Sequence, residues 1–339
     1  MTRVSSSDVA RRAGVSRATV SYVVNDRPDK TISAATRRRV LDAVRELGYV
    51  PSATAAALSA GRSRIVVLLE DIHVPAEGEA VIALGSVSGV LRNALAREVH
   101  AWGMTLVAAG SDTSLTGLLR HLEPALVISL APLTGQDTEA LDRAGCRHVS
   151  AGHRDDVGAV HPAAFVASGA SRLQVDHLVA HGHRRLAYLS TDIPAVAGLE
   201  RARRQAAHAA CAELDLPPLA EHRIGPLGSH CLTELEPLLR AWVDDGVTAV
   251  ACFNDLHAVL VLVAARHLGL AVPGDLAVIG IDDDPVASLA DPPLTTVAFD
   301  MVAFARYLAA RGRAALDGEV APPLPDATTL AHVVERAST

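Results

Sequence analysis

The feature that most constrains this chain is a set of short helical patterns in its first 48 residues, separated by turn and cap residues. A first helix is predicted from about Ser7 to Ala13, with Ser6 or Ser7 as its N-cap. Gly14 then permits a tight turn, because glycine adopts left-handed backbone angles without a steric cost. The apolar face of this helix consists of Val9, Ala10 and Ala13.

A second helix follows directly after this turn. Ser16 is expected to cap it, and it runs from Arg17 to about Val24. Its inward positions are Val20 and Val24, one helical turn apart, with Val15 packed beneath them. Two short helices joined by a tight turn need a further element to complete a core.

That element is a third helix, predicted over Ala34–Leu47 between the cap Ser33 and the stop Gly48. Its buried side chains are expected to be Val40, Ala43, Val44 and Leu47. The three helices together match the helix-turn-helix plan, in which the second helix enters the DNA major groove. The alternative is a three-helix domain that serves only for dimerisation.

The exposed start of the second helix carries side chains suited to DNA. Arg17 can make a bidentate contact to guanine, Ala18 can touch a thymine methyl group, and Tyr22 can donate to a base or a phosphate. Short polar groups that can contact phosphates and set the register are Ser16, Thr19, Ser21 and Asn25.

The distribution of charge supports a polyanionic partner for this region. The chain has 339 residues and a formal net charge of −7. Residues 1–62 nevertheless contain eleven Lys or Arg against five Asp or Glu, a net of +6, which leaves −13 for the rest. A basic head on an acidic body favours nucleic acid as the partner of the head, although scattered surface charge is the alternative.

The segments DVARRAGVSRATVSYVVNDRP and TRRRVLDAVRELGYVPSATAAALSAGRS resemble the head of the LacI family of bacterial transcription regulators. This resemblance implies a small all-α helix-turn-helix head and an α/β, two-lobed body like a periplasmic binding protein, with parallel sheets. It also implies a hinge helix in residues 51–62, with Leu58 as a minor-groove wedge and Ala55 on the same face. A helix this short is marginal when isolated, so a plain linker is the alternative.

The rest of the chain alternates apolar runs with helical patterns, which predicts parallel sheets covered by helices on both faces. Strands are expected at 65–69, 104–110, 125–131, 147–152, 186–190, 222–225, 249–253 and 276–282, with a crossing strand in 291–297 and a last strand after residue 329. The intervening helices are expected at 80–102, 114–122, 137–144, 168–181, 201–214, 233–245 and 256–268. We therefore expect lobe 1 at about 63–165 and 297–325, and lobe 2 at about 166–296 and 326–339.

In sheets of this kind ligands bind beyond the carboxyl ends of the strands, and polar residues stand at several such ends. The resemblance implies that a small-molecule effector is read by Asp71, His73, Arg201, Asn254 and Asp282. Asn254 could instead only cap the helix that follows, and Arg201 could only form a surface ion pair.

Several positions depart from the family pattern. Val74 stands where an asparagine is common, and Val166 and Ala167 replace an Asp-Asn pair. The segment GPLGSH, residues 225–230, lacks an expected aromatic ring. A standard hexose effector is therefore not expected. The open alternatives are a different small molecule and a degenerate site that leaves the regulator independent of ligand.

Other classes find little support in the sequence. It shows no signal peptide and no run of 18 uncharged apolar residues, so we expect a cytoplasmic protein without a membrane contact. Nucleotide-binding and hydrolase motifs are missing, so we expect no enzyme and no cofactor. No metal site is expected either, although His177 and His181 stand one helical turn apart.

The sequence thus predicts a sequence-specific DNA-binding transcription regulator, specifically a repressor. It is expected to bind a near-palindromic operator as a homodimer, because the two-fold symmetry of a protein is mirrored in its DNA site. An effector of unknown identity between the lobes would control operator affinity. The alternative from a different class is a small-molecule binding protein.

Overall fold

The computed structural model describes residues 4–24, 31–49, 63–70, 80–110, 114–130, 133–150, 162–226, 228, 230–323, 325 and 329–339. The chain divides into two compact units, 1–64 and 65–339, called here the head and the body. The predicted hinge helix in 51–62 lies outside the described residues.

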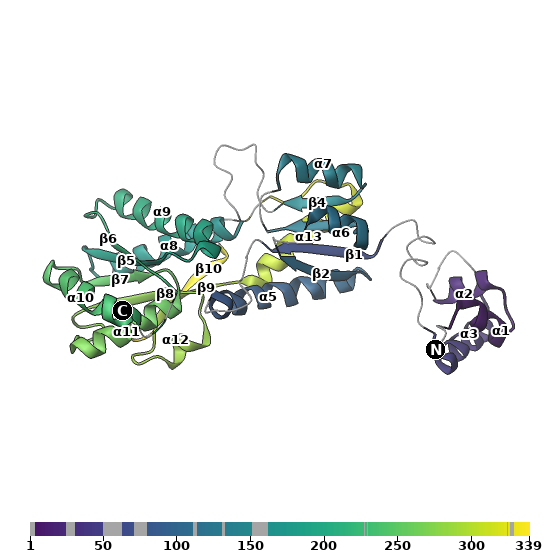
Figure 1. Ribbon diagram of the computed structural model, residues 1–339, viewed down its shortest axis with the longest axis horizontal. Helices are drawn as coiled ribbons and strands as arrows, with labels where there is room; N and C mark the ends of the chain where they lie inside the picture. Colours follow the sequence, from purple (N-terminus) through teal and green to yellow (C-terminus); the bar gives the residue numbers. More distant parts are fainter. Residues whose placement is uncertain are drawn as a thin grey trace. The chain divides into compact units, whose positions relative to one another are not determined.

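The head contains the three predicted helices, α1 (Ser6–Ala13), α2 (Arg17–Val24) and α3 (Ala34–Leu47) (Figure 1). The cap of α1 is Ser5, not Ser6 or Ser7. Ser5 Oγ accepts from the backbone N–H of Asp8 at 3.4 Å, and the Asp8 carboxylate accepts from the Ser5 N–H at 3.0 Å. This reciprocal capping box satisfies two backbone donors instead of one, which explains the earlier start.

The apolar core of the head joins all three helices. Val9, Val20 and Val40 are buried at its centre. On α2 the second buried valine is Val23, while Val24 is only partly buried, so the predicted inward position was wrong by one residue. The phase of α2 is set by its packing on α1 and α3, which a helix of eight residues does not reveal from its own pattern.

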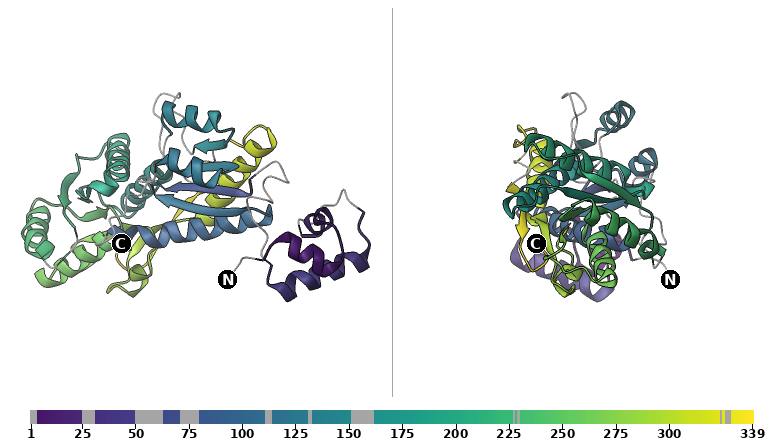
Figure 2. Two further views of the ribbon diagram at one scale, coloured as in Figure 1. Left: turned by 45° about the vertical axis from the view of Figure 1, so that its right-hand side comes forward. Right: turned by 90° about the vertical axis from the view of Figure 1, so that its left-hand side faces the viewer.

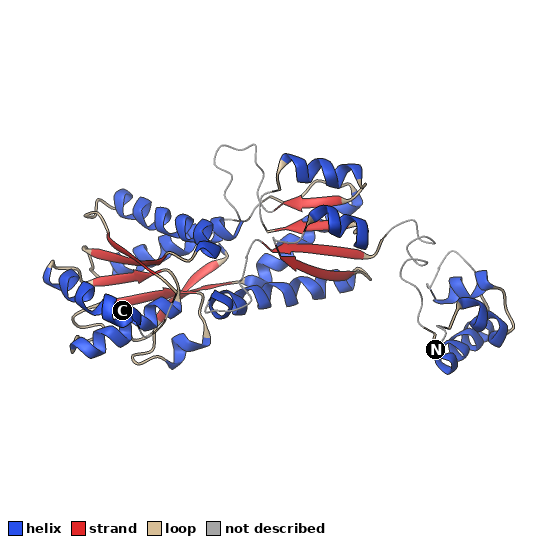
Figure 3. Ribbon diagram, viewed as in Figure 1, coloured by secondary structure: helices blue, strands red, loops and turns tan. Residues whose placement is uncertain are grey.

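The body contains a four-stranded parallel sheet with the strand order β2-β1-β3-β4 (Figure 3). Its strands are β1 (Ile65–Glu70), β2 (Thr105–Gly110), β3 (Leu126–Ser129) and β4 (Arg147–Ser150). The intervening helices are α5 (Ala80–Ala101), α6 (Leu115–Leu122) and α7 (Gly135–Arg143), and α13 (Met301–Asp317) also joins this layer.

Side chains that alternate along the strands divide between the two faces of this sheet. Val66 and Leu68 pack with residues of α5 and α13, and Val67 packs with residues of α6 and α7. Helices α5 and α13 lie side by side in both views (Figures 1 and 2). Both faces are therefore covered, as the continuous apolar runs predicted.

A second, six-stranded sheet has the order β10-β9-β8-β7-β5-β6, in which only β10 runs antiparallel to its neighbour. Its strands are β5 (Leu186–Thr191), β6 (Ala220–Ile224), β7 (Ala249–Cys252), β8 (Ala277–Ile281), β9 (Thr295–Phe299) and β10 (Ala331–Val334). Its helices are α8 (Pro162–Ala180), α9 (Ala197–Glu213), α10 (His230–Asp244), α11 (Asp255–Leu268) and α12 (Pro285–Leu289), with a short 3₁₀ turn, η1 (Pro194–Val196), before α9.

Helices α10 and α11 cover one face of this sheet, and α8 and α9 cover the other. The chain returns to the four-stranded layer at Asp300, the N-cap of α13. All of β9, up to Phe299, is paired within the six-stranded sheet, and Phe299 also packs against the core of the four-stranded layer. The lobe boundary at about residue 297 stays a prediction. No helix among the described residues is both long and apolar enough to cross a membrane.

Candidate functional site

The first turn of α2 is the exposed polar edge of the head. Ser16 Oγ accepts from the backbone N–H of Thr19 at 3.1 Å and lies 2.9 Å from Thr19 Oγ1. This cap fixes where the helix begins, and Arg17 and Ala18 then project from its exposed side. An exposed arginine at the start of such a helix is placed to reach a base edge in the major groove.

The other predicted contact residues of α2 are less exposed. Thr19, Ser21 and Tyr22 are partly buried. Their position suits contacts to the phosphate backbone beside the groove. Asn25 and the hinge residues Ala55 and Leu58 lie outside the described residues, so their roles stay predictions.

Several arginines of the head are already paired within it. Arg11 pairs with Asp8, Arg12 with Glu46, and Arg45 with Asp42. Three further exposed arginines, Arg17, Arg38 and Arg39, have no carboxylate partner in the described parts of the chain. These positive charges are available to bind phosphates, whereas the paired arginines form ion pairs within the head.

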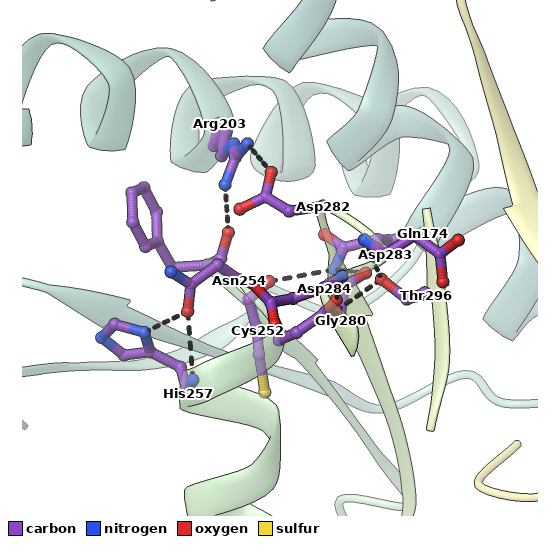
Figure 4. Close-up of polar contacts among 12 residues, drawn as sticks. Gln174, Arg203, Cys252, Asn254, His257, Gly280, Asp282, Asp283, Asp284 and Thr296 are labelled. Carbon is purple, nitrogen blue, oxygen red and sulfur yellow. Dashed lines mark hydrogen bonds and ion pairs between the residues drawn. The ribbon is translucent and has the colours of Figure 1, made fainter. Parts of the chain in front are cut away.

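The second candidate site lies in the body, where β7 and β8 end. β7 is followed by Phe253, Asn254 and Asp255, and β8 by Asp282 and its neighbours. Because β7 and β8 are adjacent and parallel, these residues meet at one edge of the sheet (Figure 4). The sequence predicted this meeting for Asn254 and Asp282.

Helix α9 brings Arg203 to this edge. The Arg203 side chain is 4% exposed and forms an ion pair with Asp282, at 2.8 Å between Nη2 and Oδ1. Its Nη1 also donates to the carbonyl oxygen of Phe253 at 2.5 Å, whereas its Nε has no partner among the described residues. A buried arginine with a spare donor is equipped to bind a further acceptor.

Two aromatic rings flank this guanidinium group. The Arg203 Cζ lies 4.9 Å from the ring centre of Phe253 and 5.9 Å from that of Phe299. Both distances are within the range of a cation–π interaction. Phe253 directly follows β7 and Phe299 is the last residue of β9, so both rings come from parts of the chain other than residues 225–230.

Asn254 caps α11 and also orients a buried histidine. Its Oδ1 accepts from the backbone N–H of His257 at 3.1 Å and from His257 Nδ1 at 2.6 Å (Figure 4). The proton of the imidazole is therefore on Nδ1. The lone pair on Nε2 is buried without a partner among the described residues. Burial and then the charge of Arg203 lower the pKa of His257 to about 3, so the ring is neutral.

Asp255 lies beside the ion pair and is also buried. Thr296 Oγ1 donates to its Oδ1 at 2.5 Å, and the backbone N–H of Asp284 donates to its Oδ2 at 2.7 Å. Burial and the charge of Asp282 raise the pKa of Asp255 to about 8, despite these two hydrogen bonds. At neutral pH this carboxyl group is thus largely protonated.

The backbone around Asp255 is tightly packed. A Cβ atom at Gly280 would lie 2.1 Å from Asp255 Oδ1 and 3.2 Å from Asp255 Cα. From α8, the amide of Gln174 donates to the carbonyl oxygens of Cys252 and Gly280, both at 3.0 Å. Gln174 thereby ties α8 to the ends of β7 and β8 (Figure 4).

Among the described residues, one further predicted effector residue, Arg201, is not brought into this cluster. Arg201 is exposed on α9, two positions before the buried Arg203, and its effector role stays a prediction. Asp71 and His73 lie outside the described residues. The sequence analysis missed Arg203. The signal that could have found it is the phase of α9, because Arg203 lies on the same helical face as the buried Ala207.

Comparison with known proteins now assigns this architecture. Residues 7–52 match the family model of the bacterial regulatory proteins of the lacI family, and residues 175–339 match the periplasmic binding protein-like domain. The HTH-type transcriptional regulator reg1 of Streptomyces lividans is 32% identical over 305 residues, which cover 86% of this chain and 84% of that protein. The chain belongs to the LacI family.

Other members of the LacI family agree with this assignment. The lactose operon repressor of Escherichia coli is 31% identical and covers 86% of this chain and 79% of its own length. A crystal structure of the lac repressor dimer bound to operator and the anti-inducer ONPF has a TM-score of 0.76 at 25% identity and covers 99% of each chain. A complex of the regulator CelR with cellobiose has a TM-score of 0.60 at 26% identity and covers 99% of this chain and all of that one.

Proposed function

We propose that this LacI-family protein represses transcription by binding a near-palindromic operator as a homodimer. The observation that carries the proposal is the exposed first turn of α2, where Arg17 and Ala18 project from a helix fixed by the Ser16 cap. Residues 1–50 of the head would supply one half-site contact per protomer, and residues 51–62 would join them to the body. Since its target is DNA, we place the protein in the bacterial cytoplasm.

The proposal includes a small polar effector bound beside Arg203 and Asp282. Support comes from the spare donor of Arg203 Nε and the spare acceptor of His257 Nε2, which are both buried. Two phenylalanine rings flank the guanidinium group and can face an apolar part of a ligand. A ligand that binds the body differently in its two states would shift operator affinity, and operator would shift ligand affinity equally.

A second candidate is a regulator that responds to no small molecule. The observation that favours it is the closed ion pair between Arg203 and Asp282, which satisfies both charges without a ligand. An effector that uses this pair must compensate for the interaction that it displaces. The two candidates share the DNA-binding head and differ only in the role of the body.

Selection of bound sequences from a random duplex library separates these candidates. The full-length protein is used at low salt, with and without fractions of a metabolite pool. A palindrome whose enrichment changes with one fraction supports the complete proposal. A palindrome that no fraction affects supports the ligand-independent regulator. If no sequence is enriched at low salt, the DNA-binding proposal is wrong, and a small-molecule binding protein becomes the better hypothesis.

A further inference from the structure

The end of α8 faces the C-terminal segment of the chain, and metal-ligating side chains gather where they meet. His177 lies in the last turn of α8, His181 is the first residue after this helix, and Glu335 follows β10. Each offers one ligand atom, and the three atoms lie within 4.8 Å of one another. This cluster is separate from Arg203 and Asp282 and takes no part in the function proposed above.

We propose that His177, His181 and Glu335 form a binding site for a divalent first-row transition metal of the Zn²⁺ type. Two imidazoles and one carboxylate are a ligand set used by zinc, with a fourth position left for water. A His-x-x-x-His spacing on a helix directs both rings to the same side. The carboxylate comes from another element, so the ion would link α8 to the C-terminal segment.

His181 is already oriented as a ligand. Its Nδ1 donates to the carbonyl oxygen of His177 at 2.9 Å, because a carbonyl can only accept. The proton is therefore on Nδ1, and the lone pair on Nε2 lies 3.6 Å from Glu335 Oε1. Two ligands of a tetrahedral ion at about 2.1 Å are roughly 3.4 Å apart, which is close to this spacing. A backbone carbonyl that fixes the tautomer is a common outer contact of metal-binding histidines.

The second imidazole, that of His177, would exchange one hydrogen-bond partner for the ion. The two histidine rings have centres 4.2 Å apart, and His177 Nε2 shares a hydrogen bond of 2.9 Å with Thr339 Oγ1. A bound ion would replace this single hydrogen bond.

The location gives the ion a structural role. Glu335 directly precedes Arg336, whose guanidinium group donates to the carbonyl oxygen of Leu294 at 2.8 Å and pairs with Asp283 at 2.6 Å. An ion that binds Glu335 to α8 would fix the C-terminal segment, and with it the ion pair of Arg336 with Asp283. Because an ion that binds only the folded chain stabilises it, Zn²⁺ is expected to raise the melting temperature.

Titration of the metal-free full chain with zinc chloride tests the site by calorimetry. The variants are His181→Gln and Glu335→Gln, since both side chains are exposed and neither change removes a core contact. The matched control is His208→Gln. His208 pairs with Glu221 at 2.9 Å on another part of the body, without a second imidazole.

We expect one Zn²⁺ to bind the wild type and His208→Gln with equal affinity, and both site variants to bind at least about tenfold more weakly. The zinc-induced rise in melting temperature should be lost in the same two variants. Visible absorption of a Co²⁺ complex provides a second signature that does not depend on stability. The proposal is wrong if the wild type shows no saturable binding, or if His181→Gln binds Zn²⁺ like the wild type.

Discussion

The head and the body differ in where their key charged side chains lie. In the head, Arg17 is exposed over a small core that is almost entirely apolar, so its charge is available to a partner. In the body, Arg203 and Asp282 are buried and satisfy each other within the fold. An exposed charge contributes little to stability, whereas a buried charge that loses its partner destabilises the fold strongly. Mutations in the two regions should therefore separate function from stability.

The largest effect is expected from Arg203→Ala. It leaves the Asp282 carboxylate buried without its counter-ion, which should lower the free energy of unfolding by about 3–5 kcal/mol. Arg201→Ala, on the exposed side of the same helix, should change it by less than about 0.5 kcal/mol. Urea denaturation of both variants measures the difference. Equal losses in the two variants would show that the buried Arg203–Asp282 pair stabilises the fold no more than an exposed arginine does.

Gly280→Ala is expected to have the next largest effect on stability. The new Cβ would lie 2.1 Å from Asp255 Oδ1, so the carboxyl group or the strand must move, at a cost of about 1–3 kcal/mol. Gly198→Ala is the matched control on α9, where no described atom outside the adjacent residues and the helix backbone lies within 4 Å of the added methyl group. Alanine favours a helix, so this control should be neutral or slightly stabilising. The melting temperatures of both variants measure the difference. A Gly280→Ala protein as stable as the wild type would show that the surroundings of Asp255 are loosely packed.

In the head, Arg17→Ala should change recognition and leave folding intact. Loss of one bidentate contact should reduce discrimination at one half-site position by about 1–3 kcal/mol. Arg17→Lys keeps the charge but loses the planar fork, so it should retain more non-specific affinity while losing the same discrimination. Binding to an operator and to its single-base variants measures both quantities. An unchanged base preference in Arg17→Ala would remove this residue from base recognition.

The smallest effect is a dependence of stability on pH. The pKa of Asp255 is raised to about 8 in the fold, so the native state binds more protons than the unfolded chain between about pH 4 and 8. Stability then falls as the pH rises through this window. The lowered pKa of His257 acts in the opposite direction, but only below its ordinary value of 6.5.

The lowered pKa values of His177 and His183 likewise act mainly below pH 6.5, so the contribution of Asp255 is expected to dominate between about pH 6.5 and 8. Stability should fall there by about 1 kcal/mol per pH unit. Asp255→Asn retains oxygen for the Thr296 hydroxyl and should remove this slope. Denaturant midpoints measured across this range test it. A slope that persists in Asp255→Asn would assign the effect to another group.

Local patterns predicted most of the elements. Gly14 and Gly48 marked the ends of α1 and α3 because both adopt left-handed backbone angles, with φ of 63° and 61°. The alternation of strands and helices predicted both sheets, since parallel strands buried on two faces are continuously apolar. Asn254 and Asp282 were found because the ends of parallel strands meet at one edge. These inferences need only neighbours in the chain or a rule of topology.

Other features depended on contacts that no local pattern contains. The sequence by itself determined the helix-turn-helix head, the two covered sheets and the membership of the LacI family, since each is written in short spacings and residue types. Only the tertiary structure decided that Arg203 and not Arg201 meets Asp282, and that Phe253 and Phe299 flank it. The physical reason is burial, because which face of a helix is buried depends on packing against strands far away in the chain.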